Sequence, residues 1–422
     1  MKARWAFGLG LSLLGAGSAA AQMPDQRPAT PAPAPAPAPM PAIAAPAACD
    51  CQPCDEPPRF FAGVDYMIWQ VKGQPVPVPI VTTSSVNNIG ILGRDDTLIL
   101  GGNGNLGFNW ISGVRVTGGY ILDTQDGWTL EGGIFFLFRK ESRQRVASDS
   151  AGNPLLASPF IDAVTGAESS LLYAVPGLFS GVVDFGGGSR FTSGEVNLAI
   201  PFSESERWRF DVLLGNRYAD LSENLDIRSS STPLEGTPGF AVGGIGVGPG
   251  DVAGDVNNFR TRNQLFAAQV GLRAVYNVAD GLFFTTTTKL AAGFNRQTVD
   301  ISGQTFIVPA SGAQPTTFDG GLWAVATNIG IQHKTNFAYL SELGLSLGYW
   351  MTDSICLTAG YQFVYFGRVV RPGNQIDRII NRSYVPQSAT FGGPAEPFRP
   401  LVPFSRSDYW AQGMSFGCEV RF

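Results

Sequence analysis

The sequence predicts an all-β fold, a transmembrane antiparallel up-and-down β-barrel of about ten strands with long loops at one end and short turns at the other. Three observations support this prediction. The chain begins with an export signal, it has no later apolar run of the roughly 20 residues that a spanning helix needs, and it ends in a strand with one apolar face. Such a chain is expected to cross a membrane with strands that close on themselves.

The last strand, Tyr409 to Phe422, carries the clearest alternation. One face of this strand is apolar, and the residues on its other face, from Ala411 to Arg421, are small or charged. An apolar face that ends on a carboxy-terminal aromatic residue resembles the signal by which outer-membrane barrels are recognised for insertion. The expected partners are therefore outer-membrane lipid and the barrel-insertion machinery, and the alternative is an amphipathic strand that ends a soluble sandwich. The predicted insertion signal consists of Trp410, Met414, Phe416, Val420 and Phe422.

Residues 1–21 have the pattern of a secretory signal peptide, because Lys2 and Arg4 precede an apolar core and the segment ends in small residues. The mature chain is expected to begin at Gln22 and to reach the bacterial outer membrane. Residues 22–58 are rich in Pro and Ala, which favours an extended polyproline conformation. We interpret them as a periplasmic linker, with contact to peptidoglycan as a hypothesis.

Three cysteines, Cys49, Cys51 and Cys54, lie in this linker. A zinc site normally takes four ligands and the only histidine of the chain is His333, so no metal site and no cofactor is predicted. A local disulfide with one remaining thiol is expected, and the pairing stays open. The net charge of −5 argues against nucleic acid as a partner.

The barrel is expected to span residues 59–422. Its first strand runs from Phe60 to Gln70, and four hairpins and the last strand complete ten, with twelve as the alternative. The short turns are expected in the periplasm and the long loops outside the cell. The predicted hairpins are Phe108–Leu122 with Trp128–Arg139, Phe191–Phe202 with Trp208–Tyr218, Asn263–Tyr276 with Leu282–Phe294, and Phe337–Tyr349 with Ile355–Phe366.

Charged residues alternate with the apolar outer positions of these hairpins. A soluble sheet would not bury so many charges without partners, whereas a barrel lumen pairs or hydrates them. The predicted lumen-lining residues are Arg115, Glu131, Arg139, Glu195, Arg209, Asp211, Arg217, Arg273, Lys289 and Glu342.

Tryptophans lie near both ends of the predicted strands, which is typical of the aromatic girdles at the two membrane interfaces. The girdle beside the short turns is predicted to contain Trp128, Trp208 and Trp350, and the girdle near the loops Trp69, Trp110 and Trp410.

Several stretches from Arg59 to Phe422 resemble a known family. They include RFFAGVDYMIWQVKG at the start, FDVLLGNRYADLSENLDI, and LGYWMTDSICLTAGYQFVYFGRVVRPGNQID before the last strand. The chain resembles the seventh family of beta-barrel porins, from planctomycete-type bacteria. The resemblance implies an outer-membrane, porin-like barrel, with no established substrate or active site.

The stretch RPGNQID looks like the signature loop of that family. We interpret it as a Pro-Gly turn capped by a carboxylate, in preference to a ligand site. Its residues are Arg371, Pro372, Gly373, Asn374, Gln375, Ile376 and Asp377.

Catalysis is not expected. A general base would have to be His333, whose neighbours in sequence are Gln332 and Lys334, leaving Asp319 or Asp377 to approach in space. An outer-membrane barrel hydrolase is the remote alternative. The glycine-rich runs lack the Lys-Ser/Thr pair of a phosphate-binding loop.

The favoured function is a passive pore for small solutes or ions, and the alternative is a plugged structural or surface-contact protein of the envelope. Ten to twelve strands allow at most a narrow channel, since clear aqueous channels appear at about 16 strands. Small inner residues such as Gly344 and Gly413 leave space that water or a folded loop could fill. Cys356 is expected to face the lumen and Cys418 the lipid, so no bond between them is predicted.

Overall fold

The computed structural model describes residues 59–122 and 126–422. The predicted signal peptide, the predicted linker as far as residue 58 and the three cysteines within it lie outside the described residues, as do residues 123–125 of the first predicted turn. These expectations therefore stay predictions.

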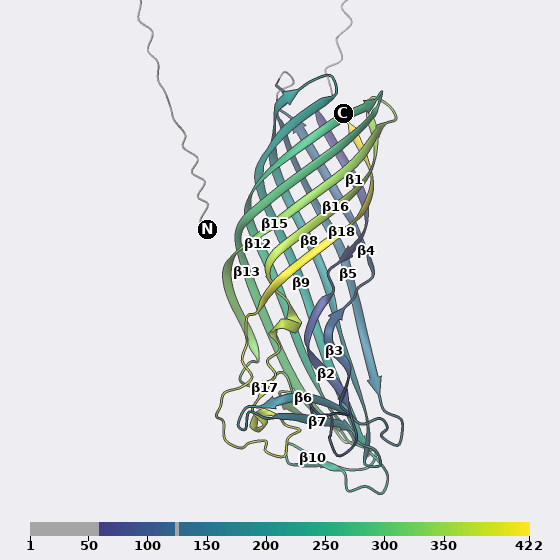
Figure 1. Ribbon diagram of the computed structural model, residues 1–422, viewed down its shortest axis with the longest axis vertical. Helices are drawn as coiled ribbons and strands as arrows, with labels where there is room; N and C mark the ends of the chain where they lie inside the picture. The colour runs from purple at the N-terminus through teal and green to yellow at the C-terminus, as the bar shows by residue number, and fades with distance from the viewer. Residues whose placement is uncertain (1–58, 123–125) are drawn as a thin grey trace, which may run out of the picture. The chain divides into compact units, whose positions relative to one another are not determined.

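Ten antiparallel strands form a closed ring (Figure 1), which confirms the predicted barrel and its strand number. Each strand pairs with its neighbours in the ring, and the pairing of β1 with β18 joins the first strand to the last. The ring consists of β1 (Phe60–Val71), β4 (Trp110–Ile121), β5 (Thr129–Ala147), β8 (Phe179–Glu204), β9 (Trp208–Pro233), β12 (Val252–Ala279), β13 (Leu282–Val308), β15 (Gly330–Trp350), β16 (Ile355–Val370) and β18 (Arg406–Arg421).

Both ends of the barrel chain lie at the end with the short turns. The backbone N–H groups of Phe60 and Phe422 each donate to the other residue's carbonyl at 2.9 Å. The hairpins β4–β5, β8–β9, β12–β13 and β15–β16 turn at this same end, which we call the turn end, and the long connections lie at the opposite, loop end. An even number of strands places both ends together.

The outer face is apolar along the predicted strands. On β18, Met414 and Phe416 are at least half exposed, whereas Ala411 between them and the loop end is fully buried. This is the period of two that a lipid-facing strand requires. Among the described residues, no helix is long and apolar enough to cross a membrane.

Four strands are much longer at the loop end than predicted. β9 continues from the predicted end at Tyr218 to Pro233, and β12 begins at Val252 instead of Asn263. Here the outer face becomes polar, with Asp220, Ser222 and Asn224 outside and buried Leu221 within. Strand pairing continues where the lipid-facing pattern ends, because a strand wall in water needs only its inner face to be apolar.

The long connections fold into a compact region at the loop end, which we call the cap (residues 72–109, 148–178, 234–251, 309–329 and 371–405). Figure 1 shows β6, β7, β10 and β17 gathered at the loop end, and β2 and β3 alongside the lower parts of the long strands. Its core joins Val76, Ile80 and Trp323 to inner-facing residues of the extended ring strands, such as Phe185 and Phe259. The short elements are β2 (Gln74–Thr83), β3 (Leu98–Leu106), β6 (Leu156–Asp162), β7 (Glu168–Ala174), β10 (Phe240–Val242), β11 (Ile245–Val247), β14 (Thr316–Asp319), β17 (Ile379–Ile380) and the 3-10 helices η1 (Pro372–Gln375) and η2 (Arg382–Tyr384).

One cap loop is held by a carboxylate. Asp96 accepts hydrogen bonds from the backbone N–H of Ser85 at 2.9 Å and from the side-chain amide of Asn88 at 2.6 Å. The bonds from Ser85 and then Asn88 lower the pKa of Asp96 to about 2. Because this folded-state pKa lies below the unfolded value, the stabilisation is present above the unfolded pKa and is lost as the pH falls through about 2.

We expect pepsin to cleave the loop between residues 84 and 97 slowly at about pH 3.5 and much faster below about pH 2. In Asp96→Ala the loop should be cleaved rapidly at both pH values, because the acceptor is absent. Mass spectrometry of the fragments measures the rates. Equal cleavage of the two proteins at the higher pH would contradict the prediction.

Candidate functional site

The lumen is the candidate site, because the predicted charged residues, the signature loop and the deepest burial meet there. From the turn end to the loop end it has three levels. These are a charged vestibule, an apolar septum that we define below, and a buried ion pair beneath the cap.

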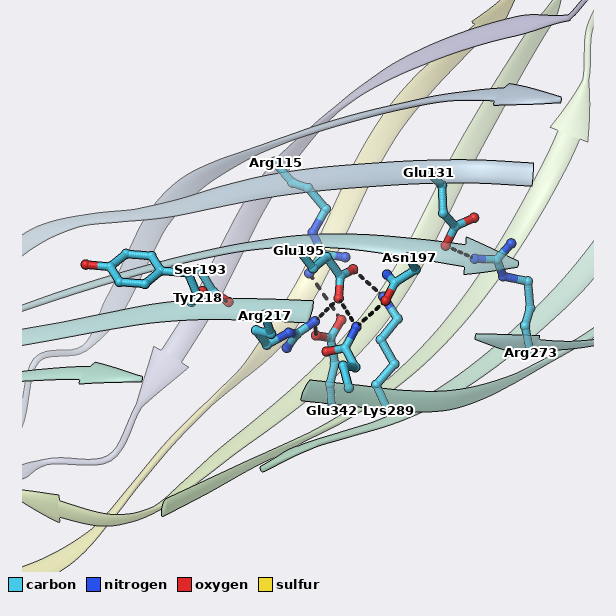
Figure 2. Close-up of polar contacts among 11 residues, drawn as sticks. Arg115, Glu131, Ser193, Glu195, Asn197, Arg217, Tyr218, Arg273, Lys289 and Glu342 are labelled. Atoms are coloured by element: carbon cyan, nitrogen blue, oxygen red, sulfur yellow. Dashed lines mark hydrogen bonds and ion pairs between the residues drawn. The ribbon is translucent and has the colours of Figure 1, made fainter. Parts of the chain in front are cut away.

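The vestibule is a cavity of about 560 Å³ whose wall includes turn-end residues such as Glu204, Arg209 and Arg421. Ion pairs cross it between strands that are not neighbours in the ring (Figure 2). Arg217 of β9 contacts Glu342 of β15 at 2.6 Å and also binds Glu195 of β8. These side chains come from strands three places apart in the ring of ten, so they cross part of the lumen at this level.

Further pairs extend this network in both directions. Lys289 of β13 binds Glu195, and the amide of Gln269 donates to Glu195 at 2.8 Å. Nearer the turn end, Arg273 of β12 binds Glu131 of β5 (Figure 2), and Arg209 donates to Asp211 at 2.9 Å. The Arg217 and Glu342 side chains are only 2 % and 6 % exposed, so their buried charges need the compensation that this network supplies, with Glu195 also on Arg217 and Arg115 also on Glu342.

Nine of the ten predicted lumen residues lie in this network or line the vestibule. They are Arg115, Glu131, Glu195, Arg209, Asp211, Arg217, Arg273, Lys289 and Glu342, with Arg115 reaching Glu342 at 3.5 Å.

Arg139 is the exception, and its prediction as a lumen residue is wrong. The pairing of β5 with β8 shifts register between Leu137 and Lys140. This bulge interrupts the inward–outward alternation of β5, so Arg139 does not face the lumen as Glu131 does. Its side chain is 56 % exposed and donates to Asn224 on the outer face of β9, at 2.8 Å.

Beyond the vestibule, all ten ring strands contribute side chains to one apolar cluster, which we call the septum. No residue of it is more than 8 % exposed. Phe191 lies among aromatic rings, with ring centroids 5.4 Å from Phe135 and 5.3 Å from Tyr409. The septum comprises Met67, Trp69, Val71, Phe108, Ile111, Phe135, Leu137, Phe191, Ala219, Leu221, Leu265, Ala267, Ala291, Ala338, Leu340, Val364, Phe366, Val369, Tyr409 and Ala411.

Two tryptophans predicted for the girdles belong to the lumen instead. Trp69 is fully buried in the septum, and Trp350 lines the vestibule with the Arg421 guanidinium 4.1 Å from its ring centroid. The two-residue alternation of the strands indicates this inward direction, because the neighbouring side chains of Ile68 and Tyr349 face outward. A side chain at Gly413 would meet the Trp69 ring at 2.8 Å, so Trp69 occupies the space that the small inner residues leave. Trp110, Trp128 and Trp208 are exposed and Trp410 half-buried.

The signature loop is the first part of the last cap segment, and it is buried instead of lying on the surface as a turn. Arg371 is completely buried and makes two hydrogen bonds to Glu223 of β9, at 2.8 and 2.7 Å. Its guanidinium also donates to the carbonyls of Gly73 and Lys72. The backbone of Val370 exchanges two hydrogen bonds of 2.8 Å with Asn263 of β12. The loop thereby joins the cap to the strand wall.

The predicted carboxylate cap of this loop is wrong in detail. Pro372 begins the short helix η1, whose C-cap is Ile376. Asp377 accepts from the backbone N–H of Ile379 at 3.0 Å, which lies after the loop, and also from Arg399 and from the backbone of Leu401, both at 2.9 Å, where the chain returns from the end of the cap. Sequence reasoning missed Glu223, which lies in a segment that polar composition marked as a loop.

His333 and the two barrel cysteines have different surroundings. His333 is exposed on β15, and within the described residues its ring contacts the Thr298 hydroxyl at 3.0 Å. In the register of β16 with β18, Cys356 lies opposite Glu419 and Cys418 lies opposite Leu357. Residues opposite one another share a face and neighbours along a strand do not, so the two thiols point to opposite faces of the sheet, as predicted. No group of three or more potential metal ligands occurs among the described residues.

Comparisons with known proteins agree with this architecture. The model of the family described as Putative beta barrel porin-7 matches residues 61–422. No curated protein matches the sequence.

Similar solved structures are outer-membrane barrels. The outer membrane protease OmpT from Escherichia coli is 9 % identical with a TM-score of 0.39, and the alignment covers 87 % of this chain and 98 % of that one. An anion-selective porin from Comamonas acidovorans is also 9 % identical, with a TM-score of 0.19 and coverage of 86 % and 98 %. At these scores the likeness carries no argument about activity.

Proposed function

Since the chain belongs to the family Putative beta barrel porin-7, and is thus a porin-type β-barrel of the outer membrane, we propose that its passage is closed in this conformation and that it acts through the cap. In this proposal the barrel is a plugged anchor, and the cap is a structural or surface-contact region of the envelope. The septum carries the proposal, because every ring strand contributes to it and its side chains are buried.

Two further features support a plugged barrel. A layer of packed side chains leaves no water-filled path, and a small barrel has an interior that side chains fill. On the vestibule side, ion pairs such as Arg217 with Glu342 join strands that are not neighbours in the ring. On the cap side, the buried Arg371–Glu223 pair and the backbone bonds of Val370 hold the signature loop against the wall.

We expect the refolded full-length protein to be electrically silent in a planar lipid bilayer. The control for folding is a heat-dependent shift in the gel mobility of protein from the same preparation, which reports a folded barrel. Discrete and reproducible conductance steps from folded protein would overturn the proposal.

The second candidate is the passive pore for small solutes or ions that the sequence favoured. The family description and the vestibule of about 560 Å³ support it. It requires the septum side chains to separate, so its signature is a conductance whose ion selectivity changes when Arg209 or Arg273 is replaced by glutamine.

We further propose that the chain is exported with cleavage before Gln22 and that its cap faces outward, since outer-membrane barrels place long loops outside. The last strand supports recognition by the insertion machinery, with exposed Met414, Phe416, Val420 and Phe422 beside Trp410. Binding to peptidoglycan through residues 22–58 stays a hypothesis. The absence of an enzymatic activity also stays a hypothesis.

A further inference from the structure

The apolar outer wall of the barrel ends on its loop side in a row of aromatic side chains. Phe337 of β15 lies opposite Phe294 of β13, which lies opposite Phe266 of β12. Phe266 in turn lies opposite Tyr218 of β9. We call these four residues the aromatic row. Its three phenylalanine side chains are more than half exposed, which is typical of an aromatic girdle at a membrane interface.

Three arginines follow the aromatic row on its loop side and on the same outer face. Arg296 lies two residues from the row on β13, and Arg262 lies four residues from it on β12. Arg262 and Arg190 of β8 lie opposite the same residue, Ser222 of β9, on its two sides. Since neighbouring strands are about 4.8 Å apart, the Cα atoms of Arg190 and Arg262 lie about 10 Å apart. We call these three arginines the arginine patch.

Two arginines of the patch have no charge partner. Arg190 and Arg296 are exposed, and within the described residues neither side chain forms an ion pair or a hydrogen bond. One carboxylate, Asp220, pairs with the third arginine. Nearby carboxylates of the outer face, Asp300 and Glu141, pair with arginines outside the patch. Three positive charges thus accompany one negative charge, in a chain whose net charge is −5.

The third arginine is held in place by a polar network. Arg262 donates from Nε to both oxygens of Asp220, at 3.2 and 3.0 Å. The Tyr218 hydroxyl donates to the same carboxylate at 3.1 Å, and Gln264 donates to that hydroxyl at 3.0 Å. The Arg262 side chain is nevertheless 49 % exposed, so it stays accessible to a ligand. A group that is ordered before binding loses less conformational entropy when it binds.

Phosphate is the anion that suits such a patch. A guanidinium binds phosphate oxygens through parallel N–H donors, and arginine is the preferred residue for this contact. Beside a lipid-facing wall, the phosphates within reach are those of lipid headgroups, and basic residues at this position attract anionic lipids. Because the aromatic row adjoins the arginine patch, a single lipid contacts both.

We propose that the arginine patch binds the phosphate headgroup of an anionic lipid whose acyl chains lie against Phe266 and Phe294. This inference rests on the place of the barrel in the outer membrane. It depends neither on whether the lumen conducts nor on which leaflet meets the loop end.

The test compares two lipids with identical acyl chains, dioleoyl phosphatidic acid and dioleoyl phosphatidylcholine. Folded full-length protein in neutral detergent is mixed with equal amounts of both, and native mass spectrometry measures the bound fraction of each. Wild-type protein should retain phosphatidic acid about five- to thirtyfold more, the range for one or two arginines beside an anionic lipid. Equimolar inorganic phosphate should not displace the lipid, because the acyl chains add to its binding.

Two double variants locate the site. Arg190→Gln combined with Arg296→Gln should remove most of the preference, while phosphatidylcholine binds as before. The matched control is Arg94→Gln combined with Arg228→Gln, which removes two positive charges that are exposed and have no ion pair in the described part of the chain. Arg94 belongs to the cap, and Arg228 lies six residues beyond Ser222 on β9. This control should keep the wild-type preference.

The proposal is overturned if wild-type protein binds the two lipids equally, or if the patch variant keeps the preference. An equal loss in the control variant also overturns it, because that is the result of charge attraction without a defined site. Displacement by inorganic phosphate would assign the patch to the free anion and overturn the lipid. A heat-dependent gel shift confirms that each variant is folded before the measurement.

Discussion

Replacing Arg371 with alanine is expected to lower the free energy of unfolding by about 3–5 kcal/mol, the range for breaking a buried ion pair by removing one partner. Arg371 and Glu223 are both fully buried, and their bidentate contact is the only charge compensation of Glu223 that the described residues show. The variant leaves that carboxylate buried without a counter-charge. It also removes the hydrogen-bond donors of the Lys72 and Gly73 carbonyls. Urea titration in lipid vesicles, followed by tryptophan fluorescence, measures the loss.

The matched control removes both charges. Arg371→Met combined with Glu223→Leu should recover most of the stability, because replacement of a whole buried pair by apolar side chains is often neutral. Recovery should be incomplete, since two backbone carbonyls stay without donors. A loss below about 1 kcal/mol in Arg371→Ala would contradict the prediction, because that is the range of a solvent-exposed ion pair.

Replacing Phe191 with alanine is expected to cost about 3–5 kcal/mol, the usual range for a large buried aromatic side chain. Phe191 is fully buried, and its ring packs between those of Phe135, Phe366 and Tyr409. These rings also limit collapse around the vacated space, so a cavity term adds to the lost apolar burial. The same urea titration measures the change.

Phe398→Ala is the matched control, because this side chain is 57 % exposed in the cap. Its stability should change by no more than about 0.5 kcal/mol. If the barrel is closed as proposed, Phe191→Ala should also stay electrically silent, since nineteen other septum residues remain from all the ring strands but β8. A small loss of stability together with new conductance would contradict both the packing of the septum and the closed barrel.

The lipid-facing half of the fold could be predicted from the residues. A bilayer requires every exposed strand position to be apolar, which writes a period of two into the sequence at residues such as Leu343, Leu345 and Leu347. That constraint identified all ten ring strands, the closure of β1 on β18 and the opposite faces of Cys356 and Cys418. It does not act beyond the membrane, so the strand extensions such as Asp220 to Pro233 were interpreted as loops.

The lumen was harder to predict. Parity indicates which residues point inward but not which of them meet, because pairs such as Arg217 with Glu342 join strands far apart in the chain. Arg139 shows the limit of parity itself, since one bulge reverses it without a local sequence signal. Trp69 shows a different error. Its position in the alternation of its strand indicates an inward side chain, but the general preference of tryptophan for membrane interfaces favours the girdle.

The sequence by itself determined an outer-membrane barrel of ten strands, the turn end and the loop end, and the inward direction of nine charged side chains. Only the tertiary structure decided that side chains from all ten ring strands meet in the septum and that Arg371 reaches Glu223. The physical reason is the range of the forces involved. Contact with lipid constrains each residue singly, whereas packing and charge pairing depend on residues that meet only after the ring has closed.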